Sequence, residues 1–231
     1  MTKFPSRPDD VFKAFAYSET AKIGKALSAP ARLVILNILC QGPRSVDRLA
    51  KHAALSVANT SQHLQVLRGA GLVDAERAGN QIIYNLASEN VAQFFTFLKE
   101  LAFMQSASLR QAFSEISGAP SRAREVGRDE LLQKVRSGEV VVIDVRPVEE
   151  YEEGHLAGAI SVPLEELEQK LADVPRNKEV IALCRGKFCV LADKAVTMLK
   201  AEGIDARRAE DGVVELKLAG TNLAGGEATD G

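Results

Sequence analysis

The hydrophobic pattern of the chain changes its period near residue 118, and this change constrains the fold more than any other feature. Before it, apolar residues recur every three or four positions, as in amphipathic helices; after it, short apolar runs alternate with helical segments. A Ser-Gly-Ala-Pro-Ser stretch separates the two patterns. The length of 231 residues suits two domains, since a domain usually takes roughly 100 to 200 residues. We therefore predict one domain over residues 1–118 and another over 119–231.

The two halves carry net charges of opposite sign. Residues 1–118 hold 13 Lys and Arg against 9 Asp and Glu, a net charge of +4, whereas residues 119–231 hold 16 against 22, a net charge of −6. A mildly basic half can approach the phosphates of a nucleic acid, and an acidic half by itself does not. If the protein binds nucleic acid, we expect the first half to do so.

The chain shows no sign of secretion or of a membrane partner. Residues 1–10 lack the apolar run of a signal peptide, and no apolar stretch approaches the roughly 18 residues that a membrane span needs. Three cysteines are too few for a disulfide framework. We expect a cytoplasmic protein in which the close pair Cys184 and Cys189 serves redox or sulfur chemistry.

The first half is predicted to be mainly helical. Apolar spacing between residues 11 and 39 indicates two helices, and Pro30 suits the first position of the second. Ser45 then caps a short helix that ends near Ala53, and Ser56 caps a longer one that ends near residue 70. Two short helices in this order form a helix-turn-helix.

A β-wing and a long helical segment are expected after the helix-turn-helix. Residues 72–77 and 81–86 have the pattern of two strands around a turn at residues 78–80. Residues 88–116 follow a helical pattern that is rich in phenylalanine and carries more apolar surface than one small domain needs. A second copy of the chain is the expected cover, which predicts a homodimer.

Three segments of the first half resemble the ArsR type of winged-helix repressors. They are residues 27–36, residues 55–73 and the end of the wing at residues 83–86, and the resemblance covers about residues 20–105. It implies a winged helix-turn-helix fold, a homodimer and a double-stranded DNA operator as partner.

On this resemblance the helix after Ser56 enters the major groove and buries Thr60, Leu64 and Leu67. The side chains presented to base edges are those of Ala58, Asn59, Ser61, Gln62 and Gln65. Candidates for phosphate contacts are Arg32, Arg68 and Arg77. The alternative is that these polar side chains form an ordinary solvated helix face.

Many ArsR-type repressors sense metals through thiolates before the recognition helix or through His and acidic pairs on the last helix. Residues 45–54 contain no Cys, and residues 91–117 contain no His or Asp. We therefore expect no metal at those sites, and no other cofactor.

The second half is predicted to be an α/β domain with a parallel sheet flanked by helices. Buried strands are expected at residues 140–144 and 180–183, among helices expected at residues 129–137, 164–172 and 190–202. In such sheets, binding and catalytic sites form at the carboxyl ends of the strands. Cys184 directly follows the second strand.

The position of Cys184 favours an ionised thiol. A loop that runs from a strand into a helix N-terminus offers backbone N–H groups and a partial positive charge to a thiolate. Arg185 and Lys187 add positive charge, and Gly186 permits a tight turn.

The motifs around this loop resemble those of rhodanese-like domains. They are residues 143–146, residues 150–160, Val162-Pro163, the loop at residues 184–189 and residues 210–212, and the resemblance covers about residues 125–222. It implies that Cys184 takes a sulfane sulfur from a donor and passes it to an acceptor thiol or cyanide. The loop assigned to this chemistry comprises Cys184, Arg185, Gly186, Lys187, Phe188 and Cys189.

The residues at and after Cys189 bear on two further questions about this loop. Related folds that bind phosphate or arsenate have an Arg six positions after the Cys, and Val190 stands there instead, which disfavours a phosphatase or an arsenate reductase. Cys189 either resolves a persulfide on Cys184 or serves as a small packing residue. Asp144, Arg146 and His155 are expected to brace the sheet rather than to take part in catalysis.

Together these features predict a DNA-binding regulator, expected to be a repressor, whose rhodanese-like domain carries or senses sulfane sulfur on Cys184. Its partners would be an operator, a sulfane sulfur donor and a thiol acceptor. The alternative is a thiosulfate or persulfide sulfurtransferase whose helical domain serves mainly for dimerisation.

Overall fold

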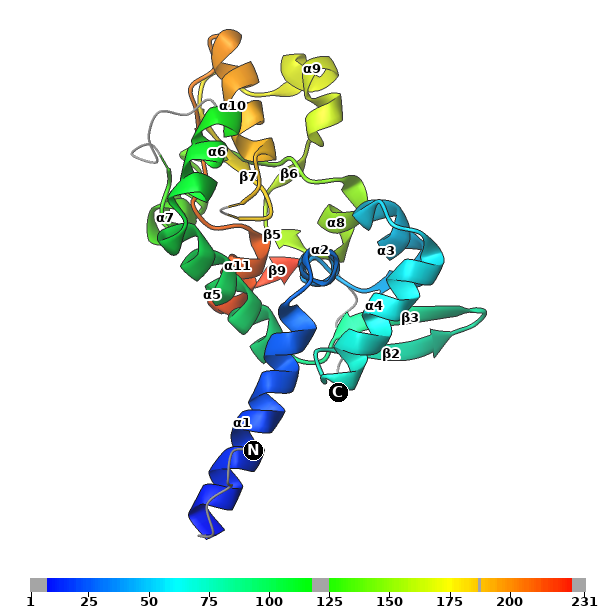
Figure 1. The fold of residues 1–231 in the computed structure, drawn as a ribbon. Helices are drawn as coiled ribbons and strands as arrows, with labels where there is room; N and C mark the ends of the chain where they lie inside the picture. The colour runs from blue at the N-terminus through cyan, green and yellow to red at the C-terminus, as the bar shows by residue number, and fades with distance from the viewer. Residues whose placement is uncertain (1–7, 118–124, 187, 226–231) are drawn as a thin grey trace. The chain divides into compact units, whose positions relative to one another are not determined.

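The computed structural model describes residues 8–117, 125–186 and 188–225 (Figure 1). The chain forms two compact units, residues 1–92 and 93–231. The boundary expected between residues 118 and 119 lies outside the described residues and remains a prediction.

The first unit begins with helices, as the sequence predicts. They are α1 (Pro8–Leu27), α2 (Pro30–Leu39), α3 (Val46–Ala53) and α4 (Val57–Gly69). Pro30 stands at the start of α2, where the missing N–H of proline costs no helical hydrogen bond. Both helices expected before residue 40 are therefore confirmed.

The helix-turn-helix is confirmed together with its two caps. The Ser45 side chain accepts a hydrogen bond from the Arg48 amide at 3.4 Å and begins α3, and Ser56 accepts one from the Asn59 amide at 3.2 Å and begins α4. Between the helices, Ala54 takes a left-handed conformation with φ 53°. The short turn therefore reverses the chain without a glycine.

The wing consists of β2 (Val73–Ala78) and β3 (Gln81–Leu86), paired antiparallel as predicted. A short strand that the sequence did not indicate, β1 (Arg44–Ser45), pairs with β3 and gives the sheet order β1-β3-β2. The sheet thus ties the start of α3 to the base of the wing.

The single helix expected over residues 88–116 is divided in two, which corrects the sequence prediction. α5 (Glu89–Gln105) ends before Ser106, and α6 (Ala107–Ser117) follows it. The Ser106 hydroxyl accepts a hydrogen bond from the Leu109 amide at 3.1 Å, and Arg110 donates to the Phe103 carbonyl at 2.8 Å. Both ends at the break are therefore capped. From Gln93 onward these helices belong to the second unit.

A parallel sheet of order β6-β4-β7-β8 forms the centre of the second unit and confirms the predicted fold class. Its strands are β4 (Val140–Asp144), β6 (Ile160–Ser161), β7 (Glu179–Leu183) and β8 (Ala206–Arg208). The main helices are α7 (Arg128–Ser137), α10 (Leu191–Ala201) and α11 (Val213–Leu218). A further short helix, α8 (Val148–Glu153), precedes the small antiparallel pair β5 (His155–Leu156) and β9 (Leu223–Ala224).

The helix expected at residues 164–172 is irregular in the structure. It consists of a 3-10 turn (Leu164–Glu166), a single helical turn α9 (Leu167–Lys170) and a second 3-10 turn (Leu171–Asp173). Only Leu167 within α9 is buried. The segment therefore contributes buried Leu167 to the core, and the half-buried side chains of Leu164 and Leu171 pack against the same cluster.

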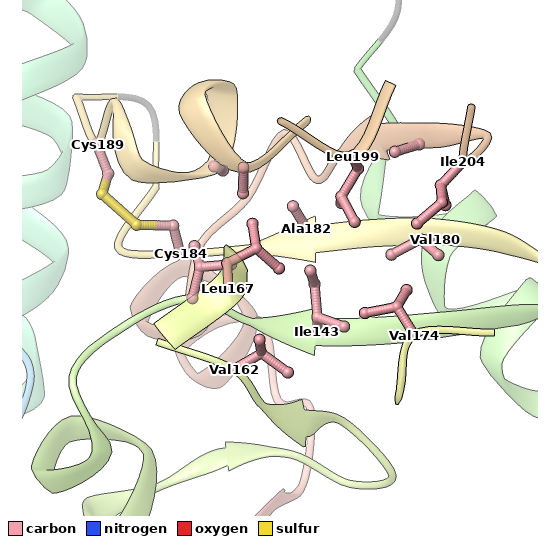
Figure 2. Packing of buried hydrophobic residues seen from close by; sticks show 14 residues of the cluster. Ile143, Val162, Leu167, Val174, Val180, Ala182, Cys184, Cys189, Leu199 and Ile204 are labelled. Carbon is pink, nitrogen blue, oxygen red and sulfur yellow. A yellow bond between two sulfur atoms is a disulfide. The ribbon is translucent and has the colours of Figure 1, made fainter. Parts of the chain in front are cut away.

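Each face of the parallel sheet packs against its own hydrophobic cluster. In β7, Val180 and Ala182 belong to one cluster, and Ile181 and Leu183 belong to the other. Figure 2 shows the first cluster, in which side chains of α10, including Leu199, cover the strands. Side chains of α7 and α11 contribute to the second cluster. The alternation follows from the two-residue period of a strand.

Candidate functional site

Helix α4 buries one face and presents the other. Thr60, Leu64 and Leu67 are buried, as predicted. Of the residues assigned to base edges, the exposed ones are Ala58, Gln62 and Gln65, and the half-buried ones are Asn59 and Ser61. The side chains assigned to base edges are thus at least partly exposed, and their role stays a prediction.

The three arginines assigned to DNA phosphates have different surroundings. Arg68 is exposed on α4, and Arg77 is exposed on β2, where it donates to the Gly79 carbonyl at 3.3 Å. Arg32 instead donates to the Ala26 carbonyl and to the Lys25 carbonyl, the latter at 3.0 Å. Because these carbonyls end α1, Arg32 caps that helix, and the structure gives it a structural role that the sequence did not indicate.

In the cysteine loop, the two thiols are joined. Cys184 follows the end of β7, and a disulfide links it to Cys189, with the two Cα atoms 6.5 Å apart (Figure 2). Cys184 is 3% exposed and Cys189 is 8% exposed, and both belong to the hydrophobic cluster of α10. The thiol expected to be ionised at Cys184 is oxidised in this structure, and whether Cys189 resolves a persulfide or only packs in the core stays a prediction.

Backbone donors of the loop are available for an anion. Among the described residues, the amides of Arg185, Gly186 and Phe188 donate to no backbone carbonyl, while the Cys189 amide donates to the Gly186 carbonyl at 3.0 Å. Lys187, which was assigned to the same loop, lies outside the described residues. These three amides are the candidates for the cradle of a sulfur anion, which remains a prediction.

The positive charge of Arg185 is compensated by a carboxylate. Its guanidinium forms a two-pronged pair with Glu150, with Nε to Oε2 at 2.8 Å and Nη2 to Oε1 at 2.6 Å. The sequence predicts that this charge acts on the Cys184 thiol. The structure corrects that expectation, because Glu150 of α8 is the direct partner of the guanidinium.

Glycines hold the loop against the start of α11. Gly186 has φ +97°, and a Cβ there would lie 2.6 Å from the Glu215 carboxylate. The Val213 amide donates to the Cys184 carbonyl at 3.1 Å. The sequence motif at residues 210–212 did not indicate that the start of α11 contacts the cysteine loop.

Glu215 is a buried carboxyl group beside the loop. It accepts a hydrogen bond from the Gly212 amide at 3.1 Å, and its Oε1 lies 4.0 Å from the Lys99 ammonium. Burial raises the pKa of Glu215 above its usual value, while the positive charge of Lys99 opposes that rise. Sequence reasoning missed this residue because nothing in its local pattern distinguishes it from a surface glutamate.

A second buried pair supports the loop from β8. Arg208 binds Asp193 of α10, with Nη1 to Oδ2 at 2.6 Å, and its Nη2 lies 3.4 Å from the Gly186 carbonyl. Neither residue was singled out from the sequence, because their partnership depends on the packing of α10 against β8.

Asp144 and Arg146 brace the domain, as expected. Arg146 binds both carboxylate oxygens of Asp144 and donates to the Gly154 carbonyl at 2.8 Å, and both side chains are buried. His155 stacks on Tyr151 with ring centroids 3.7 Å apart. These contacts fix the segment around α8.

Comparison with known proteins accounts for both halves of the chain. The family model described as "Bacterial regulatory protein, arsR family" matches residues 29–75, and the model "Rhodanese-like domain" matches residues 127–219. The "HTH-type transcriptional regulator Rv0324" of Mycobacterium tuberculosis is 38% identical over 208 residues, which cover 90% of this chain and 91% of that protein. The chain belongs to the ArsR family of regulators. This ArsR-family regulator also carries a rhodanese-like domain.

Solved structures resemble each half of the ArsR-family regulator. The homodimeric winged helix-turn-helix DNA-binding domain of Mb0332 from Mycobacterium bovis is 38% identical, covers 39% of this chain and 83% of that chain, and has a TM-score of 0.38. A rhodanese-related protein from Thermoplasma volcanium is 24% identical, covers 44% of this chain and 97% of that chain, and has a TM-score of 0.40. No helix in the described part of the regulator is long and apolar enough to cross a membrane.

Proposed function

We propose that this ArsR-family regulator is a cytoplasmic repressor that binds its operator as a homodimer and responds to sulfane sulfur through Cys184 and Cys189. The disulfide that closes the loop carries the proposal. After a sulfur transfer, two thiols at bonding distance can form a disulfide, so the covalent state of the protein changes. A single cysteine can change state only by keeping the sulfur as a persulfide.

The transfer begins from the reduced loop. The Cys184 thiolate attacks the outer sulfur of a donor R–S–SH, the donor S–S bond breaks, and R–S⁻ leaves with the electron pair and takes up a proton. Cys184 then carries a persulfide, which the amides of Arg185, Gly186 and Phe188 would hold, since none of them donates to a carbonyl of the described backbone.

Closure of the loop follows from attack by Cys189. The Cys189 thiolate attacks the Sγ atom of the Cys184 persulfide, the new disulfide forms, and the outer sulfur leaves as hydrogen sulfide. The two cysteines lose two electrons, and the sulfane sulfur gains them. Two equivalents of a low-molecular-weight thiol return the loop to the reduced state and become a disulfide themselves.

Exposed apolar side chains support the homodimer. On α5 they are Phe94, Phe97, Leu101 and Met104, and on α1 they are Val11, Phe12, Phe15 and Tyr17. Apolar surface of this extent calls for a protein cover, and the similar DNA-binding domain of Mb0332 is homodimeric. A two-fold dimer places two copies of α4 on the two halves of a palindromic operator.

The experiment compares DNA affinity in the two loop states. A gel shift with the DNA upstream of the protein's own gene is run with reduced protein, with disulfide protein, and with Cys184→Ser in both conditions. We expect specific, salt-sensitive binding whose affinity differs between the two states of the wild type and not between the two samples of the variant. Equal affinity in all four samples would refute the sensing role, and absence of specific binding would refute the repressor.

The same regulator could also turn over as a sulfurtransferase, and this activity is tested separately. The match to rhodanese-like domains favours testing it by turnover of thiosulfate with cyanide. Turnover that Cys184→Ser abolishes identifies an enzyme, whereas single loading without turnover identifies a sensor.

A further inference from the structure

Helix α5, which carries part of the proposed dimer surface, belongs largely to the same compact unit as the cysteine loop. It begins at Glu89, and from Gln93 onward its residues group with the second unit. Neither family model includes residues 93–117, since one ends at residue 75 and the other begins at residue 127. Most of α5 and all of α6 are thus additions to the unit that holds the rhodanese-like domain.

Phe188 of the cysteine loop packs against α5. Its ring centroid lies 5.8 Å from that of Phe103, and the two ring planes are tilted by 40°. Phe103 also meets Phe113 of α6 edge-on, with the centroids 5.8 Å apart. Pairs of aromatic rings in such arrangements are favourable beyond the area that they bury. The loop is therefore joined to both helices through one ring of α5.

A second contact with α5 runs through Glu215. Its Oε1 atom lies 4.0 Å from the Lys99 ammonium, and a Cβ on Gly186 would stand 2.6 Å from the same oxygen. Lys99 and Phe103 are four residues apart on α5 and therefore share one face of the helix. This face meets the cysteine loop twice, directly at Phe103 and through Glu215 at Lys99.

The opposite face of α5 is exposed and belongs to the proposed dimer surface. Lys99 stands two positions after exposed Phe97, and Phe103 stands two positions after exposed Leu101. Two positions correspond to about half a helical turn, so the two faces point in opposite directions. Any movement of α5 relative to the cysteine loop therefore also moves the dimer surface.

The disulfide restrains Phe188 beside α5. It holds the Cα atoms of Cys184 and Cys189 6.5 Å apart, and Phe188 directly precedes Cys189 in the closed ring. Reduction removes this covalent restraint and returns conformational freedom to the loop. A cavity of about 220 Å³ borders both Phe188 and Phe103, which leaves the Phe188 ring room to move. Closure of the loop thus determines how firmly Phe188 is held beside α5.

We propose that α5 is the element through which the cysteine loop controls DNA affinity. Closure of the disulfide holds Phe188 against Phe103 and fixes α5 in one position, and reduction releases it. Because the other face of α5 forms the dimer surface, the two loop states favour different spacings of the two copies of α4 on DNA. The inference rests on the proposed function, since closure and reopening of the loop are steps of that sulfur chemistry, with the same bond changes.

The first test compares DNA affinity in the reduced and disulfide states of the full-length protein, on the same DNA as the gel shift and with intact mass confirming each state. In the wild type we expect the two affinities to differ, whereas in Phe103→Ala their ratio should fall to within about twofold of one. Loss of one aromatic contact can change an equilibrium about two- to tenfold. Ile160→Ala, at an exposed side chain of β6, is the matched control and should keep the wild-type ratio.

A second variant reports on the contact itself. The chain contains no tryptophan, so Phe103→Trp introduces a single emitter and keeps an aromatic ring beside Phe188. We expect its emission intensity to differ between the reduced and disulfide states. The difference should vanish when Cys184→Ser is added, because the loop then cannot close. This measurement does not depend on DNA binding.

Two results would overturn the inference: a wild-type ratio of affinities in Phe103→Ala, or emission of Phe103→Trp that is the same in both states. If Phe103→Ala fails to fold, the emission of Phe103→Trp decides. Failure of the proposed function is distinct, because the wild type would then bind DNA equally in both states, while the emission still reports whether the loop acts on α5.

Discussion

Gly212 lies directly against the backbone of Gly186. A Cβ on Gly212 would stand 2.1 Å from the Gly186 nitrogen and 2.7 Å from the Cys184 carbonyl oxygen. Such distances leave no room for a side chain. Gly212, the N-cap residue of α11, can therefore pack against the cysteine loop only because it is a glycine.

Gly212→Ala should therefore displace the loop. Because the clashing atoms belong to the backbone, relief requires a shift of the chain, and we expect a loss of about 1 to 3 kcal/mol in the free energy of unfolding. Denaturant unfolding measures this loss. Gly127→Ala is the matched control, since a Cβ there meets its nearest atom at 3.9 Å, and an equal loss in both variants would contradict the close approach.

Asp144→Ala should destabilise the rhodanese-like domain strongly. The substitution leaves the buried Arg146 guanidinium without its carboxylate, and breaking one side of a buried pair costs about 3 to 5 kcal/mol. Thermal unfolding checks the effect. Lys170→Ala removes an exposed pair with Glu166 and should change the free energy by less than about 1 kcal/mol.

Because of Glu215, we expect the free energy of unfolding to depend on pH. Its pKa is raised in the folded protein by burial, so the folded state holds the proton more tightly than the unfolded state does. The stabilisation by this proton is full below the usual pKa of 4.5 and is lost as the pH rises through the raised value.

Glu215→Gln keeps an acceptor for the Gly212 amide but cannot ionise. We expect the stability of the wild type, measured relative to this variant by unfolding at several pH values, to fall as the pH rises above about 4.5. Lys99 and Asp211 also act on this carboxyl group, the first lowering and the second raising its pKa. A difference that stays constant or grows with pH would contradict the raised pKa.

Substitutions on α4 should separate base contacts from phosphate contacts. Gln65→Ala should cost about 1 to 3 kcal/mol of operator binding and relax sequence preference, whereas Arg68→Ala should weaken all DNA alike and lower the salt slope by about one. Binding titrations at several salt concentrations measure both. Gln111→Ala, at an exposed glutamine of α6, is the control, and equal effects of Gln65→Ala and Gln111→Ala would contradict the assignment.

The sequence predicted those elements whose signals are local. Ser45 and Ser56 begin their helices as expected, Pro30 begins α2, and the wing strands pair around the expected turn. Cap residues and alternating apolar positions act over a few residues, so the sequence alone reveals them.

The errors arose where a local pattern was interrupted or where distant residues meet. A helical pattern continued through Ser106, yet the serine caps a new helix there. Glu150 binds Arg185 from 35 residues away, and Arg208 reaches Gly186 across 22 residues. Such partners depend on the packing of the sheet, which a single sequence does not specify.

In the proposed function, Cys184 receives sulfane sulfur and Cys189 resolves the persulfide. The most direct test is the intact mass of reduced wild type, Cys184→Ser and Cys189→Ser after exposure to a persulfide donor, with Cys40→Ser as control. We expect the wild type and Cys40→Ser to lose two hydrogens and release sulfide. We expect Cys189→Ser to keep one added sulfur on Cys184, and Cys184→Ser to gain nothing in the loop. Sulfur added to Cys189 in the absence of Cys184, or no change in the wild type, would contradict it.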